Sequence, residues 1–387
     1  MNDLPRRTVF SEDHDAFRDM VRSFIDKEVT PSYLAWERAG LVDRELFRAA
    51  GSVGMLLTGT PTEFGGAGVE DWRFSAVVDE EFARAGLPSV GLGFALQNDV
   101  AAPYFLELTD DEQKKRWLPG LTSGESIAAV AMTEPAAGSD LAGIKTTARR
   151  DGTDYVLNGS KTFITNGQNA DLVVVAARTS ADRHRGLTLL IVERGMPGFE
   201  RGQNLDKLGL HGQDTSELFF TDVRVPEANR LGAEDGQGFY QLVRNLPQER
   251  LSLAVMAAAA AEGVLAETLD YVKGRKAFGQ SVGSFQNSRF ILAELQTELD
   301  IARIYVDHCI KLHSRRELTA VQAAKAKLWV SDLQFKVADR CLQLHGGYGY
   351  IREYPVARSF VDSRVQSIYG GTNEIMREII GRDMGLN

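Results

Sequence analysis

With 387 residues the chain is long enough for two or three domains, and 43% hydrophobic with 25% charged residues is the composition of a globular protein. A formal net charge of −9 excludes the overall basic footprint of a nucleic-acid-binding protein, although a local basic pocket could still hold a phosphate. The first residues contain no apolar signal region and no apolar run approaches the ~18 residues of a membrane span, so we expect a cytoplasmic protein without a membrane span.

The first third of the chain predicts helices. Apolar residues recur at helical spacing over residues 17–25, and again over residues 74–82 after a glycine-rich loop at 65–68. Thr109 forms a capping box with the glutamate three residues later, and Pro119 is expected to end the helix that begins there. None of these helices carries a pattern that indicates chemistry.

Near Ile127 the spacing of apolar residues changes from a helical to a strand period. Tyr155–Leu157 and Lys161–Thr165 flank Asn158–Gly159, and such a pair tolerates the positive φ angles of a two-residue turn, so this stretch predicts a β-hairpin. We expect a compact β domain, either a sandwich or a barrel, that ends near Leu231. Further β-rich runs lie at residues 172–176, 186–192 and 218–223.

The remainder of the chain returns to helices. Residues 237–275 predict one long core-facing helix, in which Pro247 removes a backbone donor and is expected to restart or kink the helix. Apolar stripes at residues 292–306 and 328–342 predict two further helices.

These patterns together predict an α+β fold of three domains. The expected domains are an α-helical domain at residues 1–127, a β-barrel domain at 128–235 and an α-helical domain at 236–387. Cys309 and Cys341 both fall in helical patterns, so we expect two buried thiols rather than a disulfide, which suits a reducing compartment.

Glu249 stands at the head of the apolar segment of the long helix, two residues after Pro247. The helix dipole favours a glutamate in a first turn, and beside Arg250 this residue could form only a solvated ion pair. On position alone this structural interpretation is favoured over a catalytic one, and the rest of the sequence has to decide between them.

Three other stretches contain more glycines and hydroxyls than a hydrophobic core requires, namely Ala131–Gly143, Gln343–Tyr350 and Ile368–Ile375. Small residues around a turn let backbone N–H groups approach a large ligand and donate to its oxygens. The glycines of the second stretch could form only a helix C-cap, and no strand precedes them as a dinucleotide-binding fingerprint requires. Each stretch alone is as compatible with a structural role as with a functional one.

Together these stretches resemble the acyl-CoA dehydrogenase family, and the resemblance covers the whole chain. Residues Ala131–Gly143 match the first signature of the family, and Gln343–Asp362 match the second. The resemblance implies an N-terminal helical domain, a central β barrel and a C-terminal four-helix bundle, assembled as a homotetramer. It also implies non-covalent FAD, no metal, a fatty acyl-CoA substrate, and electron transfer flavoprotein as the electron acceptor.

The chain departs from many family members at the catalytic position. Those members carry their catalytic glutamate directly before a Gly-Thr pair near the C-terminus, where this chain has Gly370. Members similar to long-chain and isovaleryl-CoA dehydrogenases carry the base on the C-terminal domain helix instead, and the matching residue is Glu249. Both Pro247–Leu251 and Tyr369–Glu374 look like the long-chain subgroup. The resemblance therefore implies Glu249 as the catalytic base and favours long or branched acyl chains.

The implied reaction is the α,β-dehydrogenation of an acyl-CoA thioester to the trans-2-enoyl-CoA. A base must remove the α-proton while a hydride leaves the β-carbon, and no amino-acid side chain accepts hydride. In the family, the thioester oxygen is polarised by a ribose hydroxyl of the flavin and by the main-chain N–H of the base, here Glu249, or of its replacement Gly370. Exclusion of water should raise the pKa of Glu249. The small residues Gly91, Gly93 and Ala95 permit a roomy pocket for the acyl chain.

The resemblance also implies ligand contacts residue by residue. Arg275 resembles the arginine that reaches the FAD pyrophosphate of a neighbouring subunit, and Phe163 stands where family members often carry a tryptophan that shields the flavin ring. The implied FAD contacts are Met132, Thr133, Ser139, Phe163, Ile164, Thr165, Arg275, Phe278, Gln286, Gln343, Gly346, Gly347, Thr372 and Glu374. The implied substrate contacts are Ser139, Tyr240, Arg250, Gly370 and Gly371.

Two other classes of function remain open from the sequence. The first is different flavin chemistry on the same scaffold, such as an oxidase, a monooxygenase or a dehydrogenase of acyl groups on a carrier protein. The second is a binding protein that has lost its base, which Gly370 would suggest and which the presence of Glu249 and the FAD motifs argues against.

Overall fold

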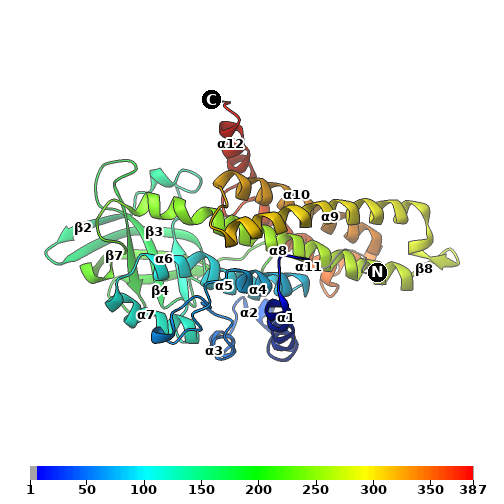
Figure 1. Cartoon of the computed structure of the whole chain (residues 1–387), viewed down its shortest axis with the longest axis horizontal. Coiled ribbons are helices and arrows are strands. Elements are labelled where there is room, and N and C mark those ends of the chain that lie inside the picture. The colour runs from blue at the N-terminus through cyan, green and yellow to red at the C-terminus, as the bar shows by residue number, and fades with distance from the viewer. Residues whose placement is uncertain (1–6, 387) are drawn as a thin grey trace.

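The computed structural model describes residues 7–386, and its elements follow the predicted order of helices, strands and helices (Figure 1). The N-terminal part consists of helices whose apolar faces meet in one core. These helices are α1 (Glu12–Phe24), α2 (Tyr33–Ala39), α3 (Arg44–Ser52), α4 (Arg73–Arg84), α5 (Pro88–Ala95), α6 (Ala102–Glu107) and α7 (Asp111–Ser123). The π-helical turns η1 (Ile25–Val29) and η3 (Leu96–Ala101) continue α1 and α5.

The predicted bounds of α7 are wrong at both ends. The side chain of Asp110, not Thr109, accepts a hydrogen bond from the Gln113 N–H (2.8 Å), and the Gln113 side chain accepts one from the Asp110 N–H (3.0 Å). Pro119 lies inside the helix, which ends instead at Gly124 with a φ of 76°. At that glycine a Cβ would lie 2.0 Å from a backbone oxygen of α3, so close packing as well as backbone conformation requires glycine there.

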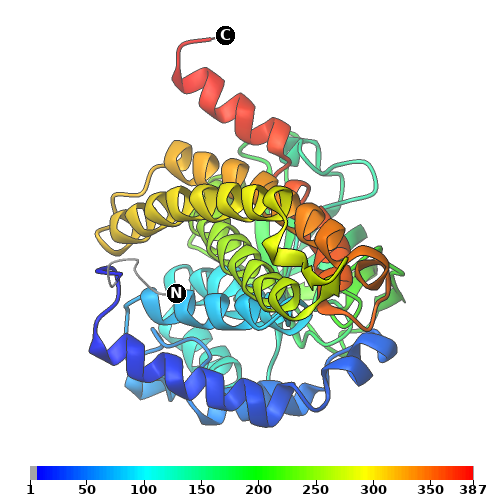
Figure 2. The ribbon, with the colours of Figure 1, turned by 90° about the vertical axis from the view of Figure 1, so that its right-hand side faces the viewer.

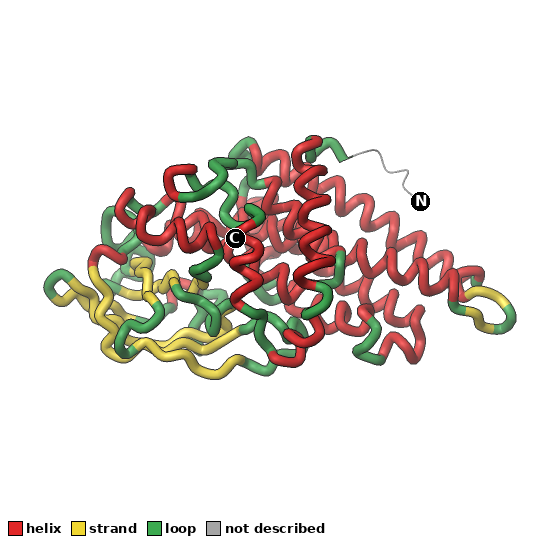
Figure 3. The backbone as a smooth tube through the Cα atoms, turned by 90° about the horizontal axis from the view of Figure 1, so that it is seen from below, coloured by secondary structure: helices red, strands yellow, loops and turns green. Residues whose placement is uncertain are grey.

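The middle part is a curled β-sheet, and its strands gather at one end of the molecule (Figure 3). In the described residues the hydrogen-bonded order is β1-β4-β2-β3-β7-β6, with β5 on the other edge of β4. The sheet encloses a second apolar core of its own, which gives the predicted β-barrel domain. Its strands are β1 (Ala128–Ala131), β2 (Thr147–Asp151), β3 (Asp154–Thr165), β4 (Leu172–Arg178), β5 (Leu187–Glu193), β6 (Phe199–Asn204) and β7 (Thr215–Pro226).

The predicted hairpin at Asn158–Gly159 is wrong, because β3 runs through this pair as one strand. The Asn158 side chain donates to the Asp222 carboxylate (3.0 Å) and accepts from its backbone N–H (2.9 Å), while the register with β7 shifts across Gly159. A Cβ on Gly159 would lie 2.5 Å from Thr146 Oγ1, so the glycine serves close strand packing rather than a turn. The actual turn lies between β2 and β3, at Gly152 with a φ of 65°.

The C-terminal part is a helical bundle in which α8 (Gly238–Gly274), α9 (Gln286–Ser314), α10 (Ala320–His345) and α11 (Pro355–Ser363) pack together. The short hairpin β8 (Lys276–Ala277) and β9 (Gln280–Ser281) lies at the end opposite the sheet (Figure 1). The last helix, α12 (Asn373–Asp383), projects from the body of the protein toward the C-terminus (Figure 2). Cys309 and Cys341 are free and buried, as predicted.

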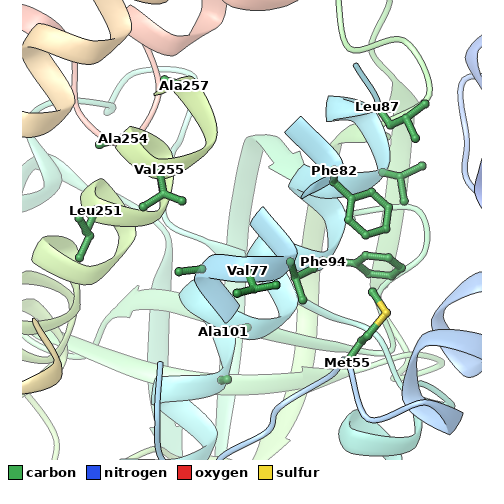
Figure 4. Packing of buried hydrophobic residues seen from close by; sticks show 14 of the residues in the cluster. Met55, Val77, Phe82, Leu87, Phe94, Ala101, Leu251, Ala254, Val255 and Ala257 are labelled. Carbon is green, nitrogen blue, oxygen red and sulfur yellow. The ribbon is translucent and has the colours of Figure 1, made fainter. Parts of the chain in front are cut away.

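The long helix α8 is the element on which the N-terminal and C-terminal helices meet. It packs against α4 as well as against α9 and α10, and it does not restart at Pro247, which lies inside it. Leu251 and Val255 on α8 face the layer that contains Val77 of α4 and Phe94 of α5 (Figure 4). Burial on both sides explains why this helix is apolar almost all round.

The described chain contains one helix, α8, that is long and apolar enough to cross a membrane by length and composition alone. Its 18-residue window includes Glu262, so it is not the unbroken apolar run that the sequence analysis did not find. Moreover, 72% of its most apolar window is buried inside the protein, and a buried core helix passes the same test.

Candidate active site

Glu249 lies on α8, and its side chain is buried with only 6% of the residue exposed. Its Oε1 atom has no hydrogen-bond partner. Burial raises the pKa of Glu249 to about 7, against the opposing effects of the Arg250 charge and the Tyr104 hydroxyl. A buried carboxyl group with a free oxygen and a pKa near neutrality is suited to accept a proton from a ligand.

The loop at Gly370 and Gly371 is held near Glu249 by two cations. Arg250 Nε donates to the Gly370 carbonyl (3.3 Å), and Lys327 Nζ donates to the Gly371 carbonyl (2.8 Å). Lys327 also donates to the Asn373 side chain (2.9 Å) at the start of α12. The structure therefore brings together three predicted site residues, Arg250, Gly370 and Gly371, next to Glu249 on α8.

Gly370 occupies a position at which a larger residue would be strained. Its φ is 63°, in the left-handed region that favours glycine, and an added Cβ would lie 2.4 Å from Leu253 Cδ1. Leu253 is one turn after Glu249 on the same face of α8. A side chain at position 370 would therefore have to displace the end of the Leu253 side chain and adopt the left-handed backbone conformation.

The predicted contacts to a flavin ring lie together at the end of β1 and on β3. The Thr162 N–H donates to the Thr133 carbonyl (3.0 Å), which places Met132 and Thr133 beside Phe163 and Thr165. Phe163 has a φ of 59° and is 65% exposed, so its ring is available to cover a ligand. In the described part of the chain the hydroxyls of Thr133 and Thr165 have no hydrogen-bond partner. Ile164, which lies between Phe163 and Thr165 on β3, is buried in the core of the sheet.

A buried ion pair holds this part of the site in shape. Lys161 Nζ donates to the Glu134 carboxylate (2.9 Å) and to the Met132 carbonyl (3.0 Å). Glu134 also accepts from the backbone N–H groups of Lys145 and Thr146. Because the charges are compensated, this polar cluster stabilises the turn that presents Met132 and Thr133.

Ser139 and Tyr240, two of the predicted substrate contacts, are exposed near one rim of the sheet. The loop between β4 and β5 connects their surroundings: Arg183 pairs with Asp140 (3.3 Å), and the His184 ring packs edge to face on Phe239 (5.0 Å). One loop therefore contacts both Asp140, which follows Ser139, and Phe239, which precedes Tyr240.

A second set of predicted FAD contacts lines a cavity of about 520 Å³ at the far end of α8 and α10. Arg275, Gln343, Gly346 and Gly347 all line it. The Arg275 guanidinium lies over the Tyr348 ring at 5.3 Å, and no carboxylate among the described residues pairs with it. Two more predicted contacts follow Arg275 in the chain: Phe278, which lies in the turn between β8 and β9 and is 97% exposed, and Gln286, the exposed first residue of α9.

One chain does not bring the two sets of predicted FAD contacts together. The ring-side residues belong to the sheet, whereas the cavity lies toward β8 at the opposite end of the molecule (Figure 1). Thr372 and Glu374 follow the Gly371 loop: the Thr372 hydroxyl accepts from the Ile375 N–H (3.3 Å) as the cap of α12, and Glu374 is exposed. A single FAD could touch both sets only if a second chain supplied one of them.

Sequence reasoning missed three residues at this site: Tyr104, Lys161 and Lys327. Tyr104 on α6 acts on Glu249 on α8, and only the tertiary fold brings these helices together. No local sequence pattern therefore predicted that Tyr104 belongs to the site. Lys161 and Lys327 are themselves buried, but exposed or half-buried residues lie close to both in the sequence, so no apolar run indicated their burial.

The residues present fit a flavin dinucleotide. The cavity offers an unpaired guanidinium and two exposed glycines, where an added Cβ would meet nothing within 4 Å, so a pyrophosphate could approach the backbone. The sheet offers two free threonine hydroxyls and an exposed aromatic ring for the isoalloxazine. This donor set contains no group of metal ligands among the described residues.

Comparison with known families identifies each part of the chain. The acyl-CoA dehydrogenase N-terminal domain matches residues 11–125, the middle domain matches residues 129–223, and the C-terminal domain matches residues 236–385.

Individual relatives match over almost the full length. The mitochondrial long-chain specific acyl-CoA dehydrogenase of Sus scrofa is 48% identical, over 99% of this chain and 89% of the relative. The mitochondrial isovaleryl-CoA dehydrogenase of Pongo abelii is 37% identical, over 96% and 88%. The crystal structure of an acyl-CoA dehydrogenase from Geobacillus kaustophilus is 46% identical, with a TM-score of 0.95 over 98% of this chain and 99% of that one.

Proposed function

This chain belongs to the acyl-CoA dehydrogenase family, and from that premise we propose that it oxidises long-chain acyl-CoA thioesters with Glu249 as the base. It is an FAD-dependent oxidoreductase that acts on a CH–CH bond and forms the trans-2-enoyl-CoA. The family membership thus answers the question of reaction class, and the alternatives left open by the sequence are not favoured.

One observation carries the choice of base. Glu249 has a buried, unpartnered oxygen and a pKa of about 7, whereas Gly370, at the other position that family members use, carries no side chain and has a backbone conformation that favours glycine. With this pKa, about half of the molecules carry a charged Glu249 at neutral pH, ready to take the α-proton. After proton transfer the neutral carboxylic acid is the form that burial favours.

The main-chain N–H of Gly370 is the better donor to the thioester oxygen. Among the described residues no backbone carbonyl accepts from it, whereas the N–H of Glu249 belongs to the interior of α8. Arg250 and Lys327 hold the carbonyls of this loop, so the direction of its N–H groups is fixed before substrate binds. A fixed donor directed at a developing negative charge lowers the barrier to proton abstraction.

FAD, when bound, supplies the hydride acceptor that no side chain can replace. The chain's own contribution is to hold it: Thr133 and Thr165 would bind the ring edge, Phe163 would cover it, and Arg275 would bind the pyrophosphate. Because Arg275 lies far from the other three, we propose that it serves the site of a second subunit, within a homotetramer.

The preference for long chains is supported by the relatives rather than by the glycines of α5. Three mitochondrial long-chain specific acyl-CoA dehydrogenases are 47–48% identical to this chain over nearly its full length. A Cβ on Gly91 would lie 2.8 Å from Phe82, and one on Gly93 would lie 2.9 Å from Gln213, so both glycines serve close packing.

Two partners complete the proposal. Electron transfer flavoprotein is the proposed acceptor of the electrons, which is supported by a 35% identical relative described as the CarC subunit of a caffeyl-CoA reductase-Etf complex. We propose a cytoplasmic location because both cysteines are free, as suits a reducing compartment.

The proposal is tested by anaerobic addition of acyl-CoAs to the FAD-loaded protein. Butyryl-, octanoyl-, palmitoyl- and isovaleryl-CoA are added in turn, and bleaching of the flavin absorbance is followed together with the enoyl-CoA product. We expect palmitoyl-CoA to bleach the flavin fastest. Faster bleaching by butyryl- or isovaleryl-CoA would contradict the long-chain assignment, and no bleaching by any of them would contradict the reaction.

A further inference from the structure

Two buried polar atoms of the active site lack hydrogen-bond partners, and they belong to neighbouring residues. One is Oε1 of Glu249, and the other is the hydroxyl of Tyr104, whose side chain is fully buried at 0% exposure. A buried hydroxyl without a partner costs free energy, so each such group in a native structure requires an explanation. The Tyr104 hydroxyl can donate a hydrogen bond, and Oε1 of the charged Glu249 carboxylate can accept one.

The segment that carries Tyr104 is held directly against the base. On either side of Glu249 on α8, the Gln248 side chain donates to the Asp99 carbonyl (2.8 Å), and the Ser252 hydroxyl donates to the Asp99 carboxylate (3.0 Å). Asp99 lies in η3, which runs without a break into α6 and Tyr104. The anchor at Asp99 therefore fixes where the phenol ring stands relative to Glu249.

The chemistry around the phenol makes it a donor to the carboxylate. Burial raises the pKa of Tyr104 well above its usual value, and the nearby Glu249 charge raises it further, so the hydroxyl keeps its proton. Asn245, one turn before Glu249 on α8, acts on the same hydroxyl and lowers its pKa. Because no group among the described residues forms a hydrogen bond with the Tyr104 hydroxyl, its proton is available to the Glu249 carboxylate.

We propose that Tyr104 is a positioning residue for the base: its hydroxyl donates to the Glu249 carboxylate, orients it toward the substrate and stabilises its charged form. This inference rests on the proposed role of Glu249. It assigns to Tyr104 the part of the site that neither the sequence pattern nor the resemblance assigned.

Other groups near Glu249 do not replace this donor. Arg250, from α8 itself, stabilises the Glu249 charge, but its guanidinium is engaged with Gly370. Lys327 from α10 is bound to the Gly371 loop. From η3 and α4, Asp99 and Asp79 meet at the Ser252 hydroxyl and are fully buried, which raises the pKa of both carboxyl groups.

The test is the pH dependence of anaerobic flavin reduction in FAD-loaded Tyr104→Phe, from about pH 5 to about pH 9, with saturating acyl-CoA. Because the hydroxyl stabilises charged Glu249, its removal should raise the apparent pKa of the reaction by about one unit. The rate at low pH should fall about tenfold and recover at high pH to within a few-fold of wild type. Tyr155→Phe is the matched control: Tyr155 is equally buried, and its hydroxyl donates to Asp235 in another part of the protein.

The outcomes separate this inference from a structural role and from failure of the proposed function. An unchanged apparent pKa in Tyr104→Phe, or an equal loss of rate at every pH, would overturn the inference. Should Tyr104→Phe not fold, Asn245→Ala keeps the phenol but removes the side chain that lowers its pKa, and the same upward shift, smaller in size, is required. Undiminished reduction in Glu249→Gln would contradict the proposed function itself, whatever Tyr104→Phe shows.

Discussion

Arg250 donates to the carbonyl of Gly370 across 3.3 Å, and this contact joins the helix that carries Glu249, the proposed base, to the loop that the family resemblance gives as the alternative position. The two alternative positions of a catalytic glutamate are therefore next to each other in space, although 121 residues separate Glu249 and Gly370 in the sequence. The helix position holds the carboxyl group, and the loop position holds a backbone in a conformation that favours glycine.

The contact between Gly370 and Leu253 predicts a measurable cost for any side chain at position 370. Gly370→Ala should destabilise the protein by ~1–3 kcal/mol, because it places an alanine in a left-handed backbone conformation and displaces the end of the Leu253 side chain. The effect is read from denaturant unfolding of the FAD-loaded protein.

Leu253→Ala provides the second half of this experiment. It should recover part of the loss caused by Gly370→Ala, since it removes the atom that lies 2.4 Å from the added Cβ, although the conformational cost remains. Strict additivity of the two substitutions would show that Leu253 does not close this position.

The raised pKa of Glu249 predicts that the native base destabilises the fold at neutral and alkaline pH. Because the folded protein holds this proton up to about pH 7 and an unperturbed glutamate loses it near 4.5, stability from this group is lost as pH rises through that window. The free energy of unfolding of Glu249→Gln should therefore equal that of wild type near pH 4.5 and exceed it by roughly 3 kcal/mol above about pH 7. Unfolding curves at both pH values check this, and a less stable Glu249→Gln at high pH would be incompatible with it.

The separation of the two FAD-contact sets predicts complementation between inactive subunits. If Arg275 serves the neighbour's site, a mixed oligomer of Glu249→Gln and Arg275→Ala chains contains one site with both defects and one site with neither. Co-expression from two differently tagged chains should restore activity that each variant lacks alone. Sites complete within one chain would give no gain on mixing, and Lys273→Ala, an exposed lysine paired with Asp270, is the control for loss of a positive charge nearby.

Helix periodicity predicted the order of domains and the extent of α8, because buried helices leave a repeating apolar pattern in the sequence. It did not predict β3, where Asn158–Gly159 has the composition of a turn but serves a bulge against β7 and the close approach of Thr146. Tertiary packing decided this case, and no local propensity contains that information.

In the candidate site, too, some residues could be predicted from the sequence, whereas others depend on tertiary packing. Glu249 and the glycine-rich stretches were recognisable from the sequence, since they resemble family motifs position by position. Tyr104 was not, because its role depends on the hydrogen bonds that fix η3 against α8. For Arg275 the resemblance already implied the FAD of a neighbouring subunit, and the structure adds that the cavity it lines lies toward β8, at the end opposite the sheet.

The most direct test of the central claim is rapid-mixing reduction of the bound flavin by palmitoyl-CoA without oxygen, in wild type, Glu249→Gln and Glu267→Gln. Glu267 lies on the same helix and is partly buried, but it is outside the site, so its variant controls for the loss of a carboxylate from α8. We expect Glu249→Gln to bind FAD and substrate yet reduce the flavin at least about a thousandfold more slowly, with Glu267→Gln close to wild type. Reduction of Glu249→Gln at a near wild-type rate would show that the base lies elsewhere.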